Sequence, residues 1–294
     1  MFVQTNSIKS IKNYFKDKLS GMFSETEIKL IGNEVICIRL SLSRGDLIGI
    51  DDKLLSESDL LYFRSIVKRL LNQEPFQYII GNAHFYGLEL KSDSRALIPR
   101  PETEELIEWI KESYRNTPIH SIADICTGSG CIALSLKSIY LNSSVLAVDV
   151  SIEALSLAKE NSLLTKLDIE LQKFDATNES EYLNNPTLVE NSFDCWVSNP
   201  PYIPELEKKD MSDNVLQFEP HLALFVPDND ALLFYKVISK MAKRFLKSNG
   251  LLFFEIHENL SNEVVILLEE LGFLEIEIRT DLQGKNRMVK AQKK

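Results

Sequence analysis

The sequence predicts an α/β protein in which a small helical domain precedes a doubly wound parallel sheet. The chain has 294 residues, about twice the size of a common single domain, so two domains are expected. Apolar residues recur at helical spacing near the start of the chain. Over the remainder, helical stretches alternate with short apolar strands, which is the pattern of a parallel sheet covered by helices.

Residues 1–82 are predicted to form the helical domain. The apolar positions that define its first and last long helices are Ile8, Ile11, Phe15 and Leu19, then Leu60, Phe63, Val67 and Leu70. Ser24 lies three residues before Glu27, which is typical of a capping box that opens a helix. Residues 83–100 contain two extended runs, 85–90 and 96–98, around Ser92-Asp93-Ser94, and this predicts a hairpin linker.

Residues 101–294 are predicted to form the second domain around the sheet. Its seven expected strands are 122–126, 145–149, 169–173, 194–198, 251–255, 274–279 and 288–291. Helical stretches lie between them, so the fold class is α/β with a Rossmann-like sheet.

Composition and charge exclude several classes of protein. The chain is 44% hydrophobic and 26% charged, and no apolar run reaches the ~20 residues needed to cross a bilayer, so a membrane protein is not expected. The segment Met1–Lys18 lacks the continuous apolar core of a secretory signal, which predicts a cytoplasmic location. The 33 basic and 43 acidic residues give a net charge of -10, which disfavours a nucleic-acid partner.

The four cysteines and four histidines do not indicate a metal. Cys37, Cys126, Cys131 and Cys195 lack the paired spacing of a zinc site, so they are interpreted as reduced, small apolar residues. A structural zinc site and a thiol enzyme are the less favoured alternatives.

A glycine-containing loop follows the first strand of the predicted sheet. It reads Asp124-Ile125-Cys126-Thr127-Gly128-Ser129-Gly130, and glycine is needed where the backbone approaches a ligand closely. Asp149 ends the next strand, 19 residues after Gly130, where a carboxylate can accept hydrogen bonds from ribose hydroxyls. The pair predicts an adenosine-containing cofactor. The glycines alone would also suit an ordinary tight turn.

The segment Ser198-Asn199-Pro200-Pro201-Tyr202-Ile203-Pro204 follows another strand and so lies at the same edge of the sheet. The side-chain oxygen of Asn199 and the carbonyl of Pro200 can accept both hydrogens of a planar NH2 group. Tyr202 offers a flat face for stacking on a conjugated amide or base. A proline-rich loop that merely caps the strand is the alternative.

With the Gly128 and Gly130 loop and Asp149, the Asn-Pro-Pro-Tyr tetrapeptide resembles the amino-group methyltransferases that use S-adenosylmethionine. One branch methylates adenine in nucleic acid, and the other methylates glutamine in peptide chain release factors. The segments that resemble only the second branch are 74–81, Leu97-Ile98-Pro99-Arg100-Pro101-Glu102-Thr103-Glu104, Phe218-Glu219-Pro220 and Ala223-Leu224-Phe225. The sequence is therefore similar to the peptide chain release factor glutamine methyltransferases over nearly its whole length.

The resemblance implies a methyltransferase domain with a seven-stranded sheet, joined by a hairpin to a helical domain for substrate recognition. It implies that S-adenosylmethionine is bound by Cys126, Thr127, Gly128, Ser129, Gly130, Asp149, Ala176 and Asn199. The substrate glutamine would be bound by Asn199, Pro200, Pro201 and Tyr202, of which Asn199, Pro200 and Tyr202 would be catalytic. A release factor would be the protein partner, with no direct contact to nucleic acid or membrane and no metal.

Three positions depart from the family pattern. Cys126 replaces the usual first glycine of the loop, His257 replaces the glycine of Glu-Ile-Gly, and Ala176 replaces a bulky residue near the adenine. Because Ala176 is small, other side chains must close the adenine pocket, and the sequence does not identify them.

Two further segments have a structural as well as a functional interpretation. Pro101 and the acids after it would favour helix initiation whether or not they bind substrate. Glu219 could contact substrate or pair within its own domain.

Three functions are weighed: protein glutamine methyltransferase, adenine methyltransferase, and a nonenzymatic binding protein. The intact Gly128, Gly130, Asp149 and Asn199 argue against a nonenzymatic protein. The absence of a basic, aromatic-rich region argues against nucleic acid. A dinucleotide oxidoreductase would use the glycine loop but gives no reason for Asn-Pro-Pro-Tyr.

Overall fold

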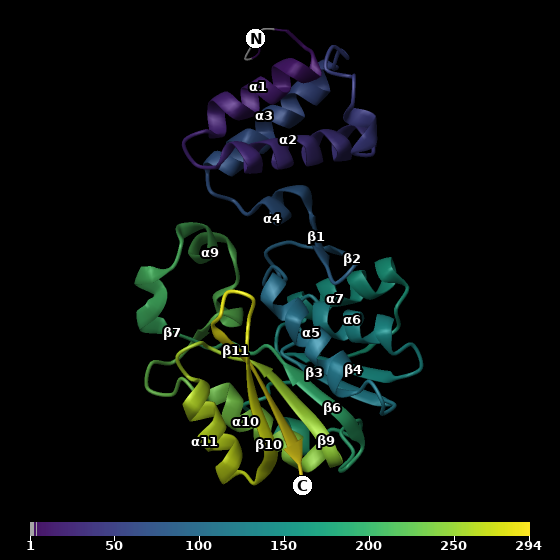
Figure 1. Cartoon of the computed structure of the whole chain (residues 1–294), viewed down its shortest axis with the longest axis vertical. Helices are drawn as coiled ribbons and strands as arrows, with labels where there is room; N and C mark the ends of the chain where they lie inside the picture. Colours follow the sequence, from purple (N-terminus) through teal and green to yellow (C-terminus); the bar gives the residue numbers. More distant parts are fainter. Residues whose placement is uncertain (1–2, 4) are drawn as a thin grey trace. The chain divides into compact units, whose positions relative to one another are not determined.

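The computed structural model describes Val3 and residues 5–294. The chain divides into two compact units (Figure 1). The first comprises the residues up to Gly81 together with Asp213–Phe218, and the second comprises Asn82–Ser212 with Glu219–Lys294. Every helix of the described residues is too short or too polar to span a lipid bilayer.

The first unit is helical, as predicted. Its elements are α1 (Ile8–Leu19), α2 (Glu25–Leu40), η1 (Gly45–Leu47), α3 (Glu57–Leu71), α4 (Phe76–Ile80) and α9 (Asp213–Phe218). The predicted capping box is confirmed, because Glu27 N donates to Ser24 Oγ (3.3 Å) while Ser24 N donates to Glu27 Oε2 (2.8 Å). The apolar stripes of α1 and α3 form the buried core of this unit, as expected from their helical spacing.

The hairpin lies earlier than the sequence predicted. It pairs β1 (Asn82–Phe85) with β2 (Leu88–Lys91), and its turn is Tyr86-Gly87. Both turn residues have positive φ, 47° and 76°, which gives the tight connection that a twisted two-stranded ribbon prefers. Residues 96–98 are not a strand, so the predicted turn at Ser92-Asp93-Ser94 is wrong.

The second unit is built on a seven-stranded sheet of order β10-β11-β9-β6-β3-β4-β5, and all seven predicted strands are present. They are β3 (Ser121–Ile125), β4 (Ser144–Asp149), β5 (Glu170–Lys173), β6 (Phe193–Ser198), β9 (Leu246–Glu255), β10 (Phe273–Thr280) and β11 (Asn286–Lys293). The helices are α5 (Pro101–Ser113), α6 (Cys131–Ile139), α7 (Ile152–Thr165), α8 (Glu179–Leu183), α10 (Leu233–Phe245) and α11 (Ser261–Glu270). The smaller elements are β7 (Ile203–Pro204), η2 (Glu205–Asp210), η3 (His221–Ala223) and β8 (Phe225–Val226).

Helices cover both faces of this sheet (Figure 1). Residues of α5 and α6 share one apolar cluster with Val145 and Ala147 of β4, whereas α10 and α11 share the other with Leu146 and Val148. Successive residues of one strand thus point to opposite faces, and both faces are buried. This is the doubly wound arrangement that the sequence predicts.

One strand breaks the predicted parallel order. β11 is antiparallel to both of its neighbours, β9 and β10, while the remaining pairs among β9, β6, β3, β4 and β5 are parallel. β10 and β11 are joined by a short turn with no helix between them, and such a connection can only reverse the chain direction.

Candidate active site

The candidate site lies where the strand order of the sheet reverses. β3 and β6 are parallel neighbours, with Ile125 level with Ser198, and the chain runs from β3 toward β4 on one side and from β6 toward β9 on the other. The loops that leave the carboxyl ends of two such strands diverge and leave a crevice, which is the usual ligand site of an open α/β sheet. The glycine loop leaves β3 here, and the Asn-Pro-Pro-Tyr loop leaves β6.

The glycine loop is fixed by backbone conformation and by a buried acid. Gly128 and Gly130 have φ of 55° and 81°, and a Cβ at Gly130 would lie 3.2 Å from the Cβ of Ala158 on α7. Asp124 Oδ2 accepts hydrogen bonds from Thr127 Oγ1 (2.6 Å) and from Ala133 N (3.2 Å). Burial raises the pKa of Asp124 to about 7, an effect that these two bonds oppose. The acid joins the loop to the first turn of α6.

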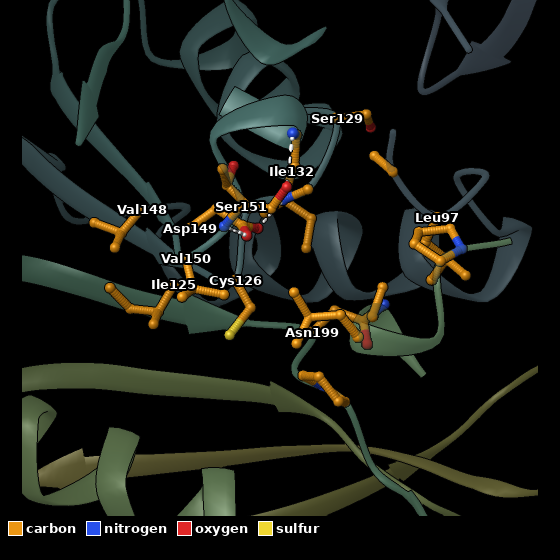
Figure 2. A pocket seen from close by; sticks show the side chains of 18 of the residues that line it. Leu97, Ile125, Cys126, Ser129, Ile132, Val148, Asp149, Val150, Ser151 and Asn199 are labelled. Atoms are coloured by element: carbon orange, nitrogen blue, oxygen red, sulfur yellow. Dashed lines mark hydrogen bonds between the residues drawn. The ribbon is translucent and has the colours of Figure 1, made fainter. Parts of the chain in front are cut away.

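Asp149 joins the same loop to the end of β4. Its Oδ2 accepts from Gly128 N (2.9 Å) and its Oδ1 from Ser151 N (2.9 Å), as Figure 2 shows for Ser151. Burial raises the pKa of the Asp149 carboxyl, and the backbone hydrogen bonds counteract this rise. Each carboxylate oxygen has a second lone pair, so Asp149 can accept from ligand hydroxyls while it holds the loop.

A pocket collects most of the predicted cofactor residues (Figure 2). The predicted residues that line it are Cys126, Thr127, Gly128, Ser129, Asp149, Ala176, Asn199 and Pro201. Gly130, Pro200 and Tyr202 do not line it; Gly130 is instead the residue that precedes α6. The sequence left the lining of the adenine pocket open, and Val150, Phe174 and Phe234 are among the apolar residues that line the pocket with Ala176.

These residues fit an adenosine-containing cofactor. Asp149 provides acceptors at the edge of the pocket, and the apolar side chains of Val150, Phe174 and Phe234 form a surface on which a planar base can pack. The positive φ of Gly128 lets the backbone reach the pocket without a side chain. Cofactor binding by the individual residues stays a prediction.

Cys126 stands in the loop where the family pattern has glycine, and its backbone lies in the left-handed region that glycine adopts without strain. Its φ is 63°, its side chain packs on the core beneath the pocket, and its sulfur is visible in Figure 2. Burial raises the pKa of the Cys126 thiol well above its usual value, which keeps the thiol protonated. All four cysteines are free, and among the described residues no group of His, Cys, Asp and Glu could hold a metal.

The backbone at Cys126 leads to a testable prediction about stability. A Cys126→Val variant places a bulkier, β-branched residue at positive φ, so we expect it to be less stable than Cys126→Gly by about 1–3 kcal/mol. Urea unfolding of both variants and the parent measures the difference. Equal stability of the valine and glycine variants would mean that φ at this position carries no strain.

The first and last residues of Asn-Pro-Pro-Tyr are both linked to the Glu255 carboxyl, Tyr202 directly and Asn199 through Thr103. Asn199 Nδ2 donates to Thr103 Oγ1 (3.3 Å), Thr103 Oγ1 donates to Glu255 Oε2 (2.6 Å), and the Tyr202 hydroxyl donates to Glu255 Oε1 (3.1 Å). Burial raises the pKa values of both Glu255 and Tyr202. The Tyr202 ring also meets His257 edge-on at 6.0 Å between centroids. Thr103 lies within the family-specific segment 97–104, but the sequence gave neither Thr103 nor Glu255 a role in the site; the acid at the end of the apolar strand β9 was the available signal.

The structure shows the local contacts of the segment around Pro101 and of Glu219, for which the sequence left both a structural and a functional role open. Arg100 precedes α5, and Pro101 occupies its first turn, so the structural interpretation of this segment is confirmed. Glu219 is buried and pairs within its unit, because its Oε1 accepts from Arg100 Nη2 (2.6 Å) and its Oε2 from Ile98 N (3.1 Å). This pair ties the segment 97–100, which lines the pocket, to Pro220.

The fold and this site define an S-adenosylmethionine-dependent methyltransferase. A family model described as the methyltransferase small domain matches residues 102–218, and one described as the PrmC N-terminal domain matches residues 30–81. A solved methyltransferase structure from Pyrococcus furiosus is similar with a TM-score of 0.50 and 17% identity, over 70% of this chain and 89% of that chain. That similarity concerns the fold alone.

The relatives identify the particular family. A release factor glutamine methyltransferase from Flavobacterium psychrophilum is 43% identical over 96% of this chain and 98% of its own length. Another, from Bacteroides thetaiotaomicron, is 34% identical over 96% of this chain and 99% of its own. The chain belongs to the release factor glutamine methyltransferase family.

Proposed function

We propose that this protein transfers a methyl group from S-adenosylmethionine to the side-chain amide nitrogen of a glutamine in a peptide chain release factor. The observation that carries the proposal is the convergence of two loops: Asn199 from the end of β6 lines the same pocket as Gly128 and Asp149. Membership of the family supplies the substrate class. We also propose that the protein acts in the cytoplasm, where release factors act in translation termination.

Positioning is the main task that this chain's residues perform. When bound, S-adenosylmethionine supplies a methyl group on a sulfonium sulfur, which is already a strong electrophile. A primary amide nitrogen is a poor nucleophile, because its lone pair is delocalised into the carbonyl. The Asn199 side-chain oxygen and the Pro200 carbonyl accept its two hydrogens and aim the nitrogen into the pocket.

The same two acceptors favour the transition state, because positive charge builds on the nitrogen as the new bond forms. The methylated nitrogen is strongly acidic and loses one proton to solvent or to a nearby acceptor, so no dedicated base is required. Tyr202 and Pro201 would complete the substrate site. Asp149 and the loop 126–130, with Ala176, would hold the cofactor.

We further propose a division of labour along the chain. Residues 1–82 would recognise the substrate protein, 83–100 would link the two domains, and 101–294 would carry out methyl transfer. The match of residues 30–81 to a family-specific amino-terminal model supports a dedicated role for the helical unit. The net charge of -10 favours a protein partner and disfavours direct binding of nucleic acid.

Methyl transfer from labelled S-adenosylmethionine tests the proposal. Purified release factors and DNA are incubated with the protein in parallel, and labelled peptides are mapped. We expect label on one glutamine of a release factor, within a segment exposed enough to enter a narrow pocket. Label on adenine in DNA and on no protein would replace this function with the adenine methyltransferase alternative.

A further inference from the structure

A buried polar network adjoins the Asn-Pro-Pro-Tyr loop, and its member Thr103 lines the same pocket as Asn199. The chemistry proposed above does not use this network. Thr103 belongs to the first turn of α5, and Glu255 is the last residue of β9. Each is 2% exposed. Neither residue is near Asn199 in sequence, yet all three lie in one chain of hydrogen bonds that runs from Asn199 through Thr103 to Glu255.

The chemistry of this chain fixes the direction of its hydrogen bonds. Both oxygens of Glu255 accept hydrogen bonds, Oε2 from Thr103 and Oε1 from Tyr202, so the single proton of the Thr103 hydroxyl is donated to Glu255 Oε2. The Thr103 oxygen can then only accept from Asn199, which requires the NH2 end of the Asn199 amide to face it. The amide oxygen of Asn199 is consequently turned away from Thr103. If the Asn199 amide were reversed, its oxygen would face the Thr103 oxygen with no hydrogen between the two atoms.

The second carboxyl oxygen of Glu255, Oε1, binds the last residue of the Asn-Pro-Pro-Tyr loop. The Tyr202 hydroxyl donates to Glu255 Oε1 at 3.1 Å, so one carboxylate restrains both the first and the fourth residue of Asn-Pro-Pro-Tyr. Burial raises the pKa of the Glu255 carboxyl, and the hydrogen bonds from Thr103 and Tyr202 and the charge of Arg287 on β11 oppose that rise. A buried carboxylate costs free energy that an apolar residue would not, and hydrogen bonds on both oxygens offset that cost.

We propose that Thr103 and Glu255 are positioning residues that orient the Asn199 amide, so that its oxygen faces the substrate NH2 group. This inference rests on the proposed role of Asn199 in binding the substrate amide. It predicts that Thr103 affects methyl transfer only through Asn199, and that the hydroxyl of Thr103 matters while its methyl group does not.

The matched variants are Thr103→Val, which keeps the shape but removes the hydroxyl, and Thr103→Ser, which keeps the hydroxyl. We expect Thr103→Val to lower the single-turnover rate by about 10- to 100-fold, because a misaligned contact is costly to a positioned reaction. We expect Thr103→Ser to stay within about 3-fold of the parent. Affinity for the demethylated cofactor, measured by calorimetry, should change little in both variants.

A double variant tests whether the effect passes through Asn199. If Thr103 acts by orienting this amide, Thr103→Val combined with Asn199→Ala should be no slower than Asn199→Ala alone. Losses that multiply, or a Thr103→Val rate equal to the parent rate, would overturn the positioning role. If Asn199→Ala itself transfers methyl at the parent rate, the proposed function of Asn199 fails first and this inference fails with it.

Nuclear magnetic resonance of the cofactor-free protein gives a readout that does not depend on activity. The side-chain NH2 signals of Asn199 are assigned by their loss in Asn199→Ala. These signals should shift in Thr103→Val, which has no hydroxyl. They should also shift in Glu255→Gln, because its NH2 group can face Thr103, and the Thr103 proton then need not point toward residue 255. They should stay in place in Thr103→Ser. Unmoved signals in Thr103→Val and in Glu255→Gln would overturn the inference even if a variant were less stable.

Discussion

Replacement of Asn199 by alanine is expected to slow methyl transfer by on the order of 100-fold or more. The variant loses one of the two acceptors that aim the substrate nitrogen, and this contact strengthens as positive charge develops on that nitrogen. The loss should therefore appear in turnover, with little change in cofactor affinity. Single-turnover rates and calorimetric affinities for S-adenosylmethionine measure the two effects separately.

Tyr202→Ala is the informative comparison for this variant. Stacking acts in the ground state as well as in the transition state, so we expect slower transfer partly through weaker substrate binding. Both variants must first match the folded parent by circular dichroism. If folded Asn199→Ala transferred methyl at nearly the parent rate, the proposed role of the Asn-Pro-Pro-Tyr loop would be wrong.

The second large effect is expected on cofactor binding. Asp149→Ala removes acceptors for ribose hydroxyls and leaves the Gly128 and Ser151 amides without their present partner. We expect S-adenosylmethionine to bind more weakly by ~1–3 kcal/mol, or roughly 5- to 150-fold. Calorimetry with the folded variant measures this loss.

Asp149→Asn provides the matched control, because it keeps the shape and one acceptor oxygen while it removes the charge and one acceptor. Its affinity should lie between those of the parent and Asp149→Ala. An unchanged affinity in folded Asp149→Ala would remove Asp149 from the cofactor site.

Local sequence patterns predicted the elements of this fold well. The seven strands of the sheet were identified because buried parallel strands are short, apolar and separated by helices with their own periodicity. The glycine loop, Asp149 and Asn199 were found because each lies at the carboxyl end of a strand, and the carboxyl ends of neighbouring parallel strands meet at one edge. These signals are local in sequence.

The hairpin turn was misplaced for a local reason. Residues 85–90 were interpreted as one extended run, but Tyr86 and Gly87 both take positive φ and reverse the chain between them. The buried positions are odd-numbered on β1 and even-numbered on β2, because Phe85 pairs with Leu88 across the two-residue turn. With strands of four residues, this change of phase is too short to be recognised in the sequence.

By itself the sequence determined the fold class and the edge of the sheet at which the glycine loop and the Asn-Pro-Pro-Tyr loop lie, since these follow from periodicity and strand order. Only the tertiary structure decided that β11 runs antiparallel, that Glu219 pairs with Arg100, and that Glu255 holds Tyr202 and, through Thr103, Asn199. Those partners lie between 53 and 152 residues apart along the chain. Hydrogen bonds over such separations depend on how helices pack on the sheet, and no spacing rule within one segment encodes that packing.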